Sequence, residues 1–159
     1  MNMKWQVREV RPADAEGVVA VWNPIIATGK YTAFTEPFSA EAERAYIEGL
    51  GPRDIFLVAV EPNCHEIVGF QSMSPFPSLT PTFAHVGTLG TFVALARQRQ
   101  GVASALFTET FRIARERGYE KLFTYVRADN PAGLLTYIRH GFRVVGTAQR
   151  QAKFGDNYV

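Results

Sequence analysis

The stretch Arg97–Leu106, RQRQGVASAL, holds the first residues whose types and spacing suit a chemical task. A run rich in β-branched and aromatic residues precedes it and a run with helical spacing follows, so a strand should give way to a helix near Gly101. The start of a helix leaves backbone N–H groups unpaired and carries partial positive charge. Glycine in the turn lets a phosphate approach those groups closely. The stretch therefore suits a pyrophosphate held mainly by main-chain donors, from Gln98, Arg99, Gln100, Gly101, Val102, Ala103 and Ser104.

Other phosphate-binding signatures are missing from the sequence, since neither GxxxxGK[ST] nor GxGxxG occurs. An ordinary strand–turn–helix unit with a solvated basic turn fits the same spacing equally well. Spacing alone leaves both interpretations open.

A second candidate pair, Asn130 and Tyr137, lies in the segment NPAGLLTYIRHGF, which is predicted to be a helix. The two residues are seven positions apart, or about two helical turns, so both can face the same way. Asn130 suits the N-cap of this helix and Pro131 suits its first turn. Taken singly, Tyr137 also fits a core aromatic residue, and Asn130 fits a plain cap.

The elements that must position these residues follow from the hydrophobic pattern, in the order β-α-α-β-β-β-α-β-α-β. Strands are predicted over residues 4–10, 54–60, 65–74, 84–95, 121–126 and 143–150. Helices are predicted over residues 11–25, 40–50, 102–117 and 130–142. Ser39 should cap the second helix, with Glu43 near the capping-box position. This order predicts a mixed α/β (α+β) domain, antiparallel in the middle of its sheet and parallel near Gly101.

Composition limits the kind of protein. We expect a single domain over residues 1–159, because 47% hydrophobic and 20% charged residues are typical of a soluble globular chain of this length. No apolar run approaches the length of a membrane span, and the N-terminus lacks the apolar region of a signal peptide. We therefore expect a cytoplasmic protein that does not bind a membrane. A net charge of +2 without a Lys/Arg block argues against nucleic acid as partner. The single cysteine, Cys64, most simply occupies a turn, and no metal-ligand spacing occurs.

Two motifs together resemble those of the GNAT superfamily of N-acetyltransferases. QRQGVA resembles its [QR]-x-x-G-x-[GA] signature, and ADNPAGLLTYIRHGF is similar to its second signature, in which an Asn leads a helix that carries a Tyr and ends in Gly-Phe. Within that superfamily, residues 22–50 resemble the branch that acetylates amino acids and phosphinothricin-like compounds. The resemblance implies a central twisted sheet of six to seven strands flanked by about four helices. The family's chain normally continues past KFGDNYV, so we expect its last strand to be short or absent here.

The resemblance also implies an activity: transfer of an acetyl group from acetyl-CoA to a primary amine, by direct attack in a ternary complex and without a metal. The pyrophosphate would lie on Gln98 to Ser104, and the pantetheine arm would pair with the backbone near Phe92 and Val93, where a free N–H can polarise the thioester carbonyl. Asn130 would touch the cofactor arm. Tyr137 would act as general acid, because a phenol of ordinary pKa ~10 is protonated at neutral pH and can give its proton to the leaving thiolate.

The sequence offers several candidates for the residues that bind the amine acceptor and take its proton. Tyr31 and Phe34 lie in the loop expected to cover the acceptor site, where aromatic residues either wall a small-molecule pocket or plug the core. Glu36, His85 or a water relay are the candidates for taking a proton from the amine. The related enzymes carry a Glu in the strand before the signature, where this chain has Thr88.

Three alternatives follow from the same residues. The preferred hypothesis is an enzyme that acetylates a small molecule such as an amino acid, working as a homodimer. A protein N-terminal or lysine acetyltransferase would need an open groove, against which the proline-bearing aromatic loops argue mildly. A non-catalytic acetyl-CoA-binding module would not need Tyr137.

Overall fold

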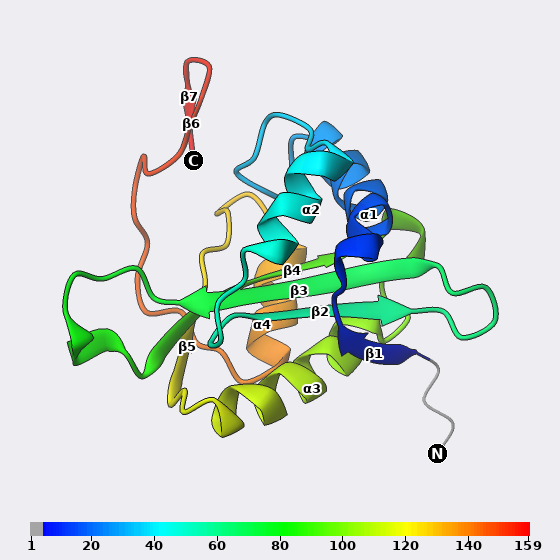
Figure 1. Ribbon diagram of the computed structural model, residues 1–159. Helices are drawn as coiled ribbons and strands as arrows, with labels where there is room; N and C mark the ends of the chain where they lie inside the picture. The colour runs from blue at the N-terminus through cyan, green and yellow to red at the C-terminus, as the bar shows by residue number, and fades with distance from the viewer. Residues whose placement is uncertain (1–4) are drawn as a thin grey trace.

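A five-stranded mixed sheet in the order β1-β2-β3-β4-β5 organises the computed structural model, which describes residues 5–159 (Figure 1). The strands are β1 (Gln6–Glu9), β2 (Ile55–Val60), β3 (Ile67–Pro75), β4 (Val86–Val93) and β5 (Lys121–Phe123). The first four pair with one another in antiparallel fashion, and β4 and β5 are parallel. This confirms the mixed α/β fold, and the parallel pair joins the strands that precede and follow the Gly101 turn in the chain. The predicted start of the first strand at Lys4 lies outside the described residues.

Helices cover both faces of the sheet, two on each (Figure 1). They are α1 (Ala15–Ala27) and α2 (Ala40–Glu48) on one face, and α3 (Val102–Glu116) and α4 (Pro131–Arg139) on the other. Single turns of 3-10 helix occur at Pro12–Asp14, Pro81–Phe83 and Leu95–Arg97. Because both faces are covered, every residue of β2 is buried, as in strands sandwiched between two helical layers.

The core accordingly forms two clusters, one beneath each helical pair. On the α1–α2 face, Val18 and Ile25 pack against Phe56, Val58 and Phe70. On the α3–α4 face the buried members include Leu57, Val68, Leu106, Phe107 and Tyr137. Away from the register shift between Ala59 and Val60, alternate residues of each strand point to opposite clusters.

The predicted helix ends are confirmed at several residues. Ser39 caps α2 by accepting a hydrogen bond from the backbone N–H of Ala42, and Asn130 caps α4 with Pro131 in its first turn. Gly141, just past α4, adopts a left-handed φ of +90°. The capping box at Ser39 is wrong, because Glu43 lies one position beyond the capping-box site and is buried instead.

The strand count is also different from the prediction. Over the described residues the central sheet has five strands rather than six to seven, and residues 143–150 carry no strand. Val144 and Val145 have the β-branched character of a strand, but they are 59% and 71% exposed and pair with no described edge of the sheet. The chain instead ends in a separate hairpin of β6 (Lys153–Phe154) and β7 (Asn157–Tyr158), which stands away from the body (Figure 1).

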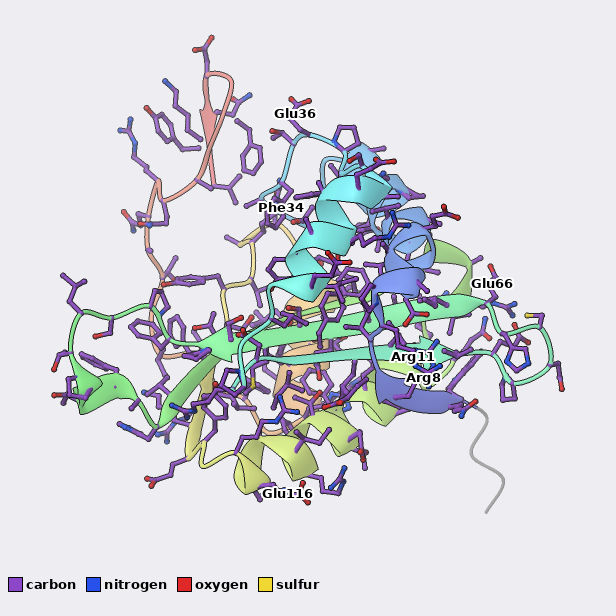
Figure 2. The ribbon with its side chains drawn as sticks, in the orientation of Figure 1. Arg8, Arg11, Phe34, Glu36, Glu66 and Glu116 are labelled. Carbon is purple, nitrogen blue, oxygen red and sulfur yellow. The ribbon has the colours of Figure 1, made fainter. Side chains whose placement is uncertain are left out.

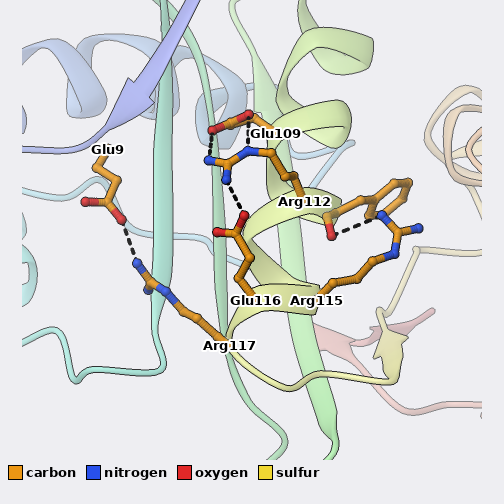
Figure 3. A network of polar contacts seen from close by, with 7 residues as sticks. Glu9, Glu109, Arg112, Arg115, Glu116 and Arg117 are labelled. Atoms are coloured by element: carbon orange, nitrogen blue, oxygen red, sulfur yellow. Dashed lines mark hydrogen bonds and ion pairs between the residues drawn. The ribbon is translucent and has the colours of Figure 1, made fainter.

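Charged side chains tie the first strand to the helices around it. Arg8 of β1 makes a bidentate ion pair with Asp14 at 2.7 and 2.8 Å, beside Arg11 at the junction with α1 (Figure 2). Arg117, at the end of α3, pairs with Glu9 at 2.6 Å, while Arg112 on the solvent face of α3 pairs with Glu109 and Glu116 (Figure 3). The Arg112 pairs are largely exposed, and exposed ion pairs contribute little each, about 0–1 kcal/mol, so the layers depend mainly on the apolar clusters.

Candidate active site

The turn before α3 has the backbone geometry that the sequence predicts for an anion site. Gly101, the N-cap of α3, has φ +87°, and Arg99 two residues earlier has φ +59°, which is uncommon for a residue with a side chain. Among residues 5–159 no side chain caps this helix, and its first turn has no acidic residue. The first N–H groups, at Val102, Ala103 and Ser104, therefore have no acceptor within the helix and can serve an anion.

This turn is held from outside by a residue that the sequence analysis did not single out. Trp5, which is buried, donates its indole N–H to the carbonyl oxygen of Gln100 at 2.9 Å. Gln100 in turn donates its side-chain amide to the carbonyl oxygen of Ala96 at 3.0 Å. Arg97 pairs with Glu61 in the β2–β3 turn at 2.5 Å. The turn before α3 is thus fixed to the N-terminal segment and to the neighbouring hairpin.

Ser104, one of the predicted phosphate-binding residues, has its hydroxyl engaged with α4. The Oγ of Ser104 lies 3.1 Å from Nε2 of His140, whose Nδ1 lies 2.8 Å from the carbonyl oxygen of Thr136. That carbonyl can only accept, so Nδ1 carries the hydrogen and, in a neutral ring, Ser104 donates to Nε2. The hydroxyl of Ser104 therefore joins the first turn of α3 to the end of α4, and its backbone N–H is the group open to an anion.

The parallel strands β4 and β5 separate after a short stretch of pairing. They pair only over Val86–Thr88 with Lys121–Phe123. Beyond Thr88, the hydroxyl of Thr124 donates to the carbonyl oxygen of Leu89 at 2.8 Å, and in the described chain no strand pairs with the outer edge of β4 further on. Phe92 and Val93 lie on this stretch and pair with β3 on their other side only. The edge can accept an extended, amide-bearing ligand as an added strand.

Asn130 and Tyr137 approach this edge from α4. The Tyr137 side chain is buried, and its hydroxyl donates to Oγ1 of Thr91 on β4 at 3.1 Å. Its ring also makes edge contacts with Phe107 and Phe142, at centroid distances of 5.6 and 5.2 Å. Asn130 is buried too, and its Oδ1 accepts from the N–H of Gly133 at 2.9 Å. The phenol of Tyr137 thus lies at the strand edge where β4 and β5 have separated.

The loop between α1 and α2 carries Tyr31, Phe34 and Glu36. Phe34 packs edge-on against Trp22 at 5.0 Å and against Phe38 at 5.4 Å, and both Phe34 and Tyr31 are partly exposed to solvent. Glu36 is exposed and points outward from the tip of the loop (Figure 2). Arg127 donates to the carbonyl oxygen of Thr32 at 3.0 Å. The loop therefore lies against the segment that leads into α4.

His85 directly precedes β4 and Thr88 lies within it, and the two residues differ in solvent exposure. His85 is exposed, and its carbonyl oxygen accepts from the N–H groups of Glu120 and Lys121. Thr88 faces the α1–α2 side, where its Oγ1 is buried and has no hydrogen-bond partner among the described residues. A buried hydroxyl without a partner is costly and so is a candidate contact for a ligand.

Sequence reasoning did not identify the full or partial burial of three polar side chains near these elements. Glu43 of α2 faces the core, and burial raises the pKa of its carboxyl group. Gln71 and Thr91 lie opposite each other on β3 and β4 and are joined by a hydrogen bond of 2.7 Å. The one signal in the sequence was a polar residue within a mostly apolar strand or helix face. Gln71 within IVGFQSM is an example.

An open depression of about 370 Å³ lies apart from these residues, between the start of α1 and the β2–β3 turn. Gly17, His65, Glu66 and Ala94 are among its lining residues, and none of the predicted site residues lines it. The candidate active site is therefore the edge of β4 with the start of α3 and the phenol of Tyr137.

Among the residues that the structure describes, no helix is both long enough and apolar enough to cross a membrane.

A mixed sheet whose parallel strands separate beside a glycine-initiated helix is the arrangement of an acyl-CoA-dependent transferase. The model of the acetyltransferase (GNAT) family matches residues 24–142, and the chain belongs to this family. It is an acetyl-CoA-dependent N-acetyltransferase, with acetyl-CoA as co-substrate.

Individual relatives agree in sequence and in fold. Phosphinothricin N-acetyltransferase of Streptomyces coelicolor is 27% identical over 154 residues, covering 94% of this chain and 89% of the relative. The GCN5-related N-acetyltransferase from Kribbella flavida is 25% identical, with a TM-score of 0.83 over 98% of this chain and 92% of that one. The phosphinothricin acetyltransferase from Sinorhizobium meliloti, whose crystal structure is a complex with AcCoA, is 14% identical, with a TM-score of 0.88 over 99% of this chain and 84% of that one.

Proposed function

We propose that this enzyme acetylates the primary amine of a small molecule, an amino acid or an analogue of one, by direct attack in a ternary complex. The observation that carries the proposal is the buried phenol of Tyr137 at the open edge of β4, next to the uncapped start of α3. The similarity to phosphinothricin N-acetyltransferase over 94% of the chain supports an acceptor of amino-acid type.

Two parts of the chain would hold acetyl-CoA. The N–H groups of Val102, Ala103 and Ser104, with the left-handed turn at Gly101, would bind its pyrophosphate. The open edge of β4 at Phe92 and Val93 would bind its pantetheine amides as a neighbouring strand does. A backbone N–H on this edge would stabilise the negative charge that develops on the thioester oxygen.

Tyr137 would then supply the proton for the leaving thiolate. Its burial among Phe107 and Phe142 limits competition by water, and its hydrogen bond to Thr91 fixes the direction of the phenol. Asn130 would contact the cofactor arm through its carboxamide, although its Oδ1 is already used to cap α4.

The proton that the amine loses has no single obvious acceptor. Glu36 and His85 are both exposed, so the structure does not place either of them in an enclosed site with the amine. Thr88 would hydrogen-bond the acceptor through its unpartnered Oγ1, but it cannot take a proton at neutral pH. A weak base favours an amine that deprotonates easily: an α-amino group, whose ordinary pKa is about 8, rather than a lysine-type amine, whose ordinary pKa is about 10.4.

Tyr31 and Phe34 would wall the acceptor pocket from the loop between α1 and α2. Phe34 is anchored on Trp22 and Phe38, which supports a preformed aromatic wall. Arg127 closes this side by joining the loop to the segment before α4. A closed wall favours a small molecule over a polypeptide acceptor.

We also propose that the enzyme is a homodimer. Val144 and Val145 are exposed β-branched residues in a segment that pairs with no strand of residues 5–159, and the hairpin after it has only two residues in each strand. A hairpin of this size is at best marginally stable alone, so a second copy of the chain would give the segment a partner. The cytoplasmic location and the single domain stay predictions from the sequence.

The proposal is tested by measuring thiol release from acetyl-CoA with amino acids, polyamines, aminoglycosides and lysine peptides as acceptors. We expect turnover with a small α-amino acceptor. A clear preference for lysine peptides or an N-terminal peptide would instead identify a protein acetyltransferase. Binding of acetyl-CoA without turnover on any amine would identify a non-catalytic module.

The role of Tyr137 is tested by Tyr137→Phe, which keeps the ring and removes the acidic proton. Proton transfer by a positioned group contributes about 10²–10⁴-fold, so kcat should fall within or somewhat below that range while acetyl-CoA binds nearly as before. Tyr158→Phe, an exposed tyrosine of the terminal hairpin, is the matched control and should be unchanged. Wild-type turnover in Tyr137→Phe would reduce this residue to a packing role.

A further inference from the structure

Gln71 is a polar residue at a fully buried position in the middle of β3. It is 0% exposed, and it points to the α3–α4 face, between the apolar side chains of the cluster that includes Val68 and Met73. A buried amide costs free energy unless its hydrogen bonds are made. Gln71 makes one, from Nε2 to Oγ1 of Thr91 at 2.7 Å, while its Oε1 has no partner among the described residues. An apolar residue would pack at this position at lower cost, which suggests that the amide has a role.

Thr91 connects this amide to the proposed acid. Its Oγ1 lies opposite Gln71 across the β3–β4 pair and also accepts from the hydroxyl of Tyr137 at 3.1 Å. The three side chains thus form one chain of hydrogen bonds that runs from the centre of the sheet to the phenol. Gln71 can only donate through Nε2, so it occupies one lone pair of Thr91 and leaves the single hydrogen of Thr91 to be directed elsewhere.

The same three side chains can carry the opposite hydrogen-bond order during turnover. Rotation of the Thr91 hydroxyl lets it donate to the Tyr137 oxygen, which frees the phenolic hydrogen to point into the site. As the O–H bond of Tyr137 breaks and an S–H bond forms on the leaving thiolate, the phenolate that remains accepts from Thr91, which still accepts from Gln71. The proton that the attacking amine loses to water then returns through water to the Tyr137 phenolate, so the phenol is restored and no net proton is left over. A hydrogen bond to an ionised group is stronger than one to a neutral group, so this order favours the transferred state.

We propose that Gln71 and Thr91 are positioning residues for Tyr137: they fix its phenol at the edge of β4 and stabilise its oxygen while the proton is away. This inference rests on the proposed role of Tyr137 as general acid. It explains why a costly buried amide stands among the otherwise apolar buried residues of β3.

The first test compares Thr91→Val with Thr91→Ser. Valine keeps the shape of threonine but loses the hydroxyl, whereas serine keeps the hydroxyl. We expect Thr91→Val to lower kcat by about 10-fold to 100-fold, the value of one hydrogen bond to a charged group, with KM for acetyl-CoA nearly unchanged. Thr91→Ser should retain most of the activity. Equal losses in both variants would mean that packing matters and the hydroxyl does not, which would overturn the proposal.

Gln71→Met provides a second variant, which separates activity from stability. Methionine fills a similar volume without a polar amide, so it removes the unpartnered Oε1 together with the donor. We expect an unchanged or higher melting temperature together with a lower kcat. A merely structural amide would give a lower melting temperature with kcat unaffected, and that result would refute the role of Gln71.

A double-mutant cycle separates this inference from the proposed function. If Thr91 acts through Tyr137, Thr91→Val should have little further effect on kcat in a Tyr137→Phe background. An equal loss in both backgrounds would show that Thr91 acts independently of the phenol. A loss on Tyr137→Phe with none on Thr91→Val would leave the acid role standing and remove the positioning role. No loss on Tyr137→Phe would remove both.

Discussion

Several single residues of this chain carry polar groups in buried positions, where burial costs free energy. Gln71, Glu43 and Thr88 all carry a buried oxygen with no hydrogen-bond partner among the described residues. Thr88 and Glu43 belong to the α1–α2 side, and Gln71 belongs to the side of Tyr137. Buried polar groups are normally satisfied, so such atoms identify positions where function and stability are in tension.

Glu43 allows that cost to be measured. Burial raises the pKa of its carboxyl above the ordinary value, so folding favours the neutral form. Below the ordinary pKa the group is neutral in both states. As pH rises past that value, only the unfolded chain ionises freely, and stability falls until the pH passes the folded-state pKa. Glu43→Gln should therefore raise the melting temperature at pH 7 more than at pH 4.

Glu41, two residues earlier on α2, is the control, with the opposite sign. Hydrogen bonds from its own backbone N–H and from the hydroxyl of Ser39 lower the pKa of its carboxyl. Its contribution is therefore present at neutral pH and disappears as pH falls through the folded-state pKa. Glu41→Gln should lose stability at pH 7 and not at low pH. Parallel pH profiles for the two variants would show that Glu43 carries no burial cost.

At the scale of elements, the start of α3 is set by its contact with β3. Gly69 lies beneath Val102, the first residue of the helix. A Cβ at Gly69 would stand 2.8 Å from Cγ1 of Val102 and 2.9 Å from the backbone oxygen of Phe92, both closer than real contacts allow. The missing side chain of Gly69 thus lets the helix start approach the sheet.

Gly69→Ala should therefore affect both stability and cofactor binding. Overpacking of this kind costs typically 1–3 kcal/mol, roughly 2–12 °C in melting temperature for a chain of this size. Displacement of Val102 should also raise KM for acetyl-CoA. Gly146→Ala is the control, because a Cβ there would meet nothing within 4 Å. A normal KM in folded Gly69→Ala would show that the position of the helix start does not limit binding.

Many features of the helices and strands could be predicted because the sequence signals for them are local. The caps at Ser39 and Asn130 and the glycine start of α3 depend on residues within a few positions of each other. The strand over 143–150 was predicted wrongly because a strand exists only where another edge pairs with it, which the pattern around Val144 cannot reveal. The link from Gln71 through Thr91 to Tyr137 depends on strand register and helix placement, so no local pattern indicates it.

At the scale of the whole molecule, the segment after α4 lies outside the sheet and the helices that form the body of the protein. It leaves the sheet, exposes Val144 and Val145, and ends in the hairpin of β6 and β7 (Figure 1). One cation–π contact links the hairpin to the segment before α4: the guanidinium of Arg127 lies 4.4 Å from the centre of the Phe154 ring.

The proposed homodimer is checked by sedimentation velocity. We expect the wild-type chain to sediment as a dimer and the double variant Val144→Asp, Val145→Asp to sediment as a monomer, because two charges would be buried unpaired at the interface. The melting temperature of the monomer's body should change little, since both residues are exposed within one chain. Leu79→Asp, at a fully exposed position of another loop, is the control. A monomeric wild type would contradict the proposal directly.

The single cysteine has a practical consequence that follows from its place in the fold. Cys64 is exposed in the turn between β2 and β3, and Glu61 and Glu66 of that turn are ion-paired with Arg97, two residues before Arg99. A fluorophore attached to this one thiol would therefore sit beside the segment proposed to receive the pyrophosphate. Its emission could follow acetyl-CoA binding directly, with no amine present and no second labelling position to remove.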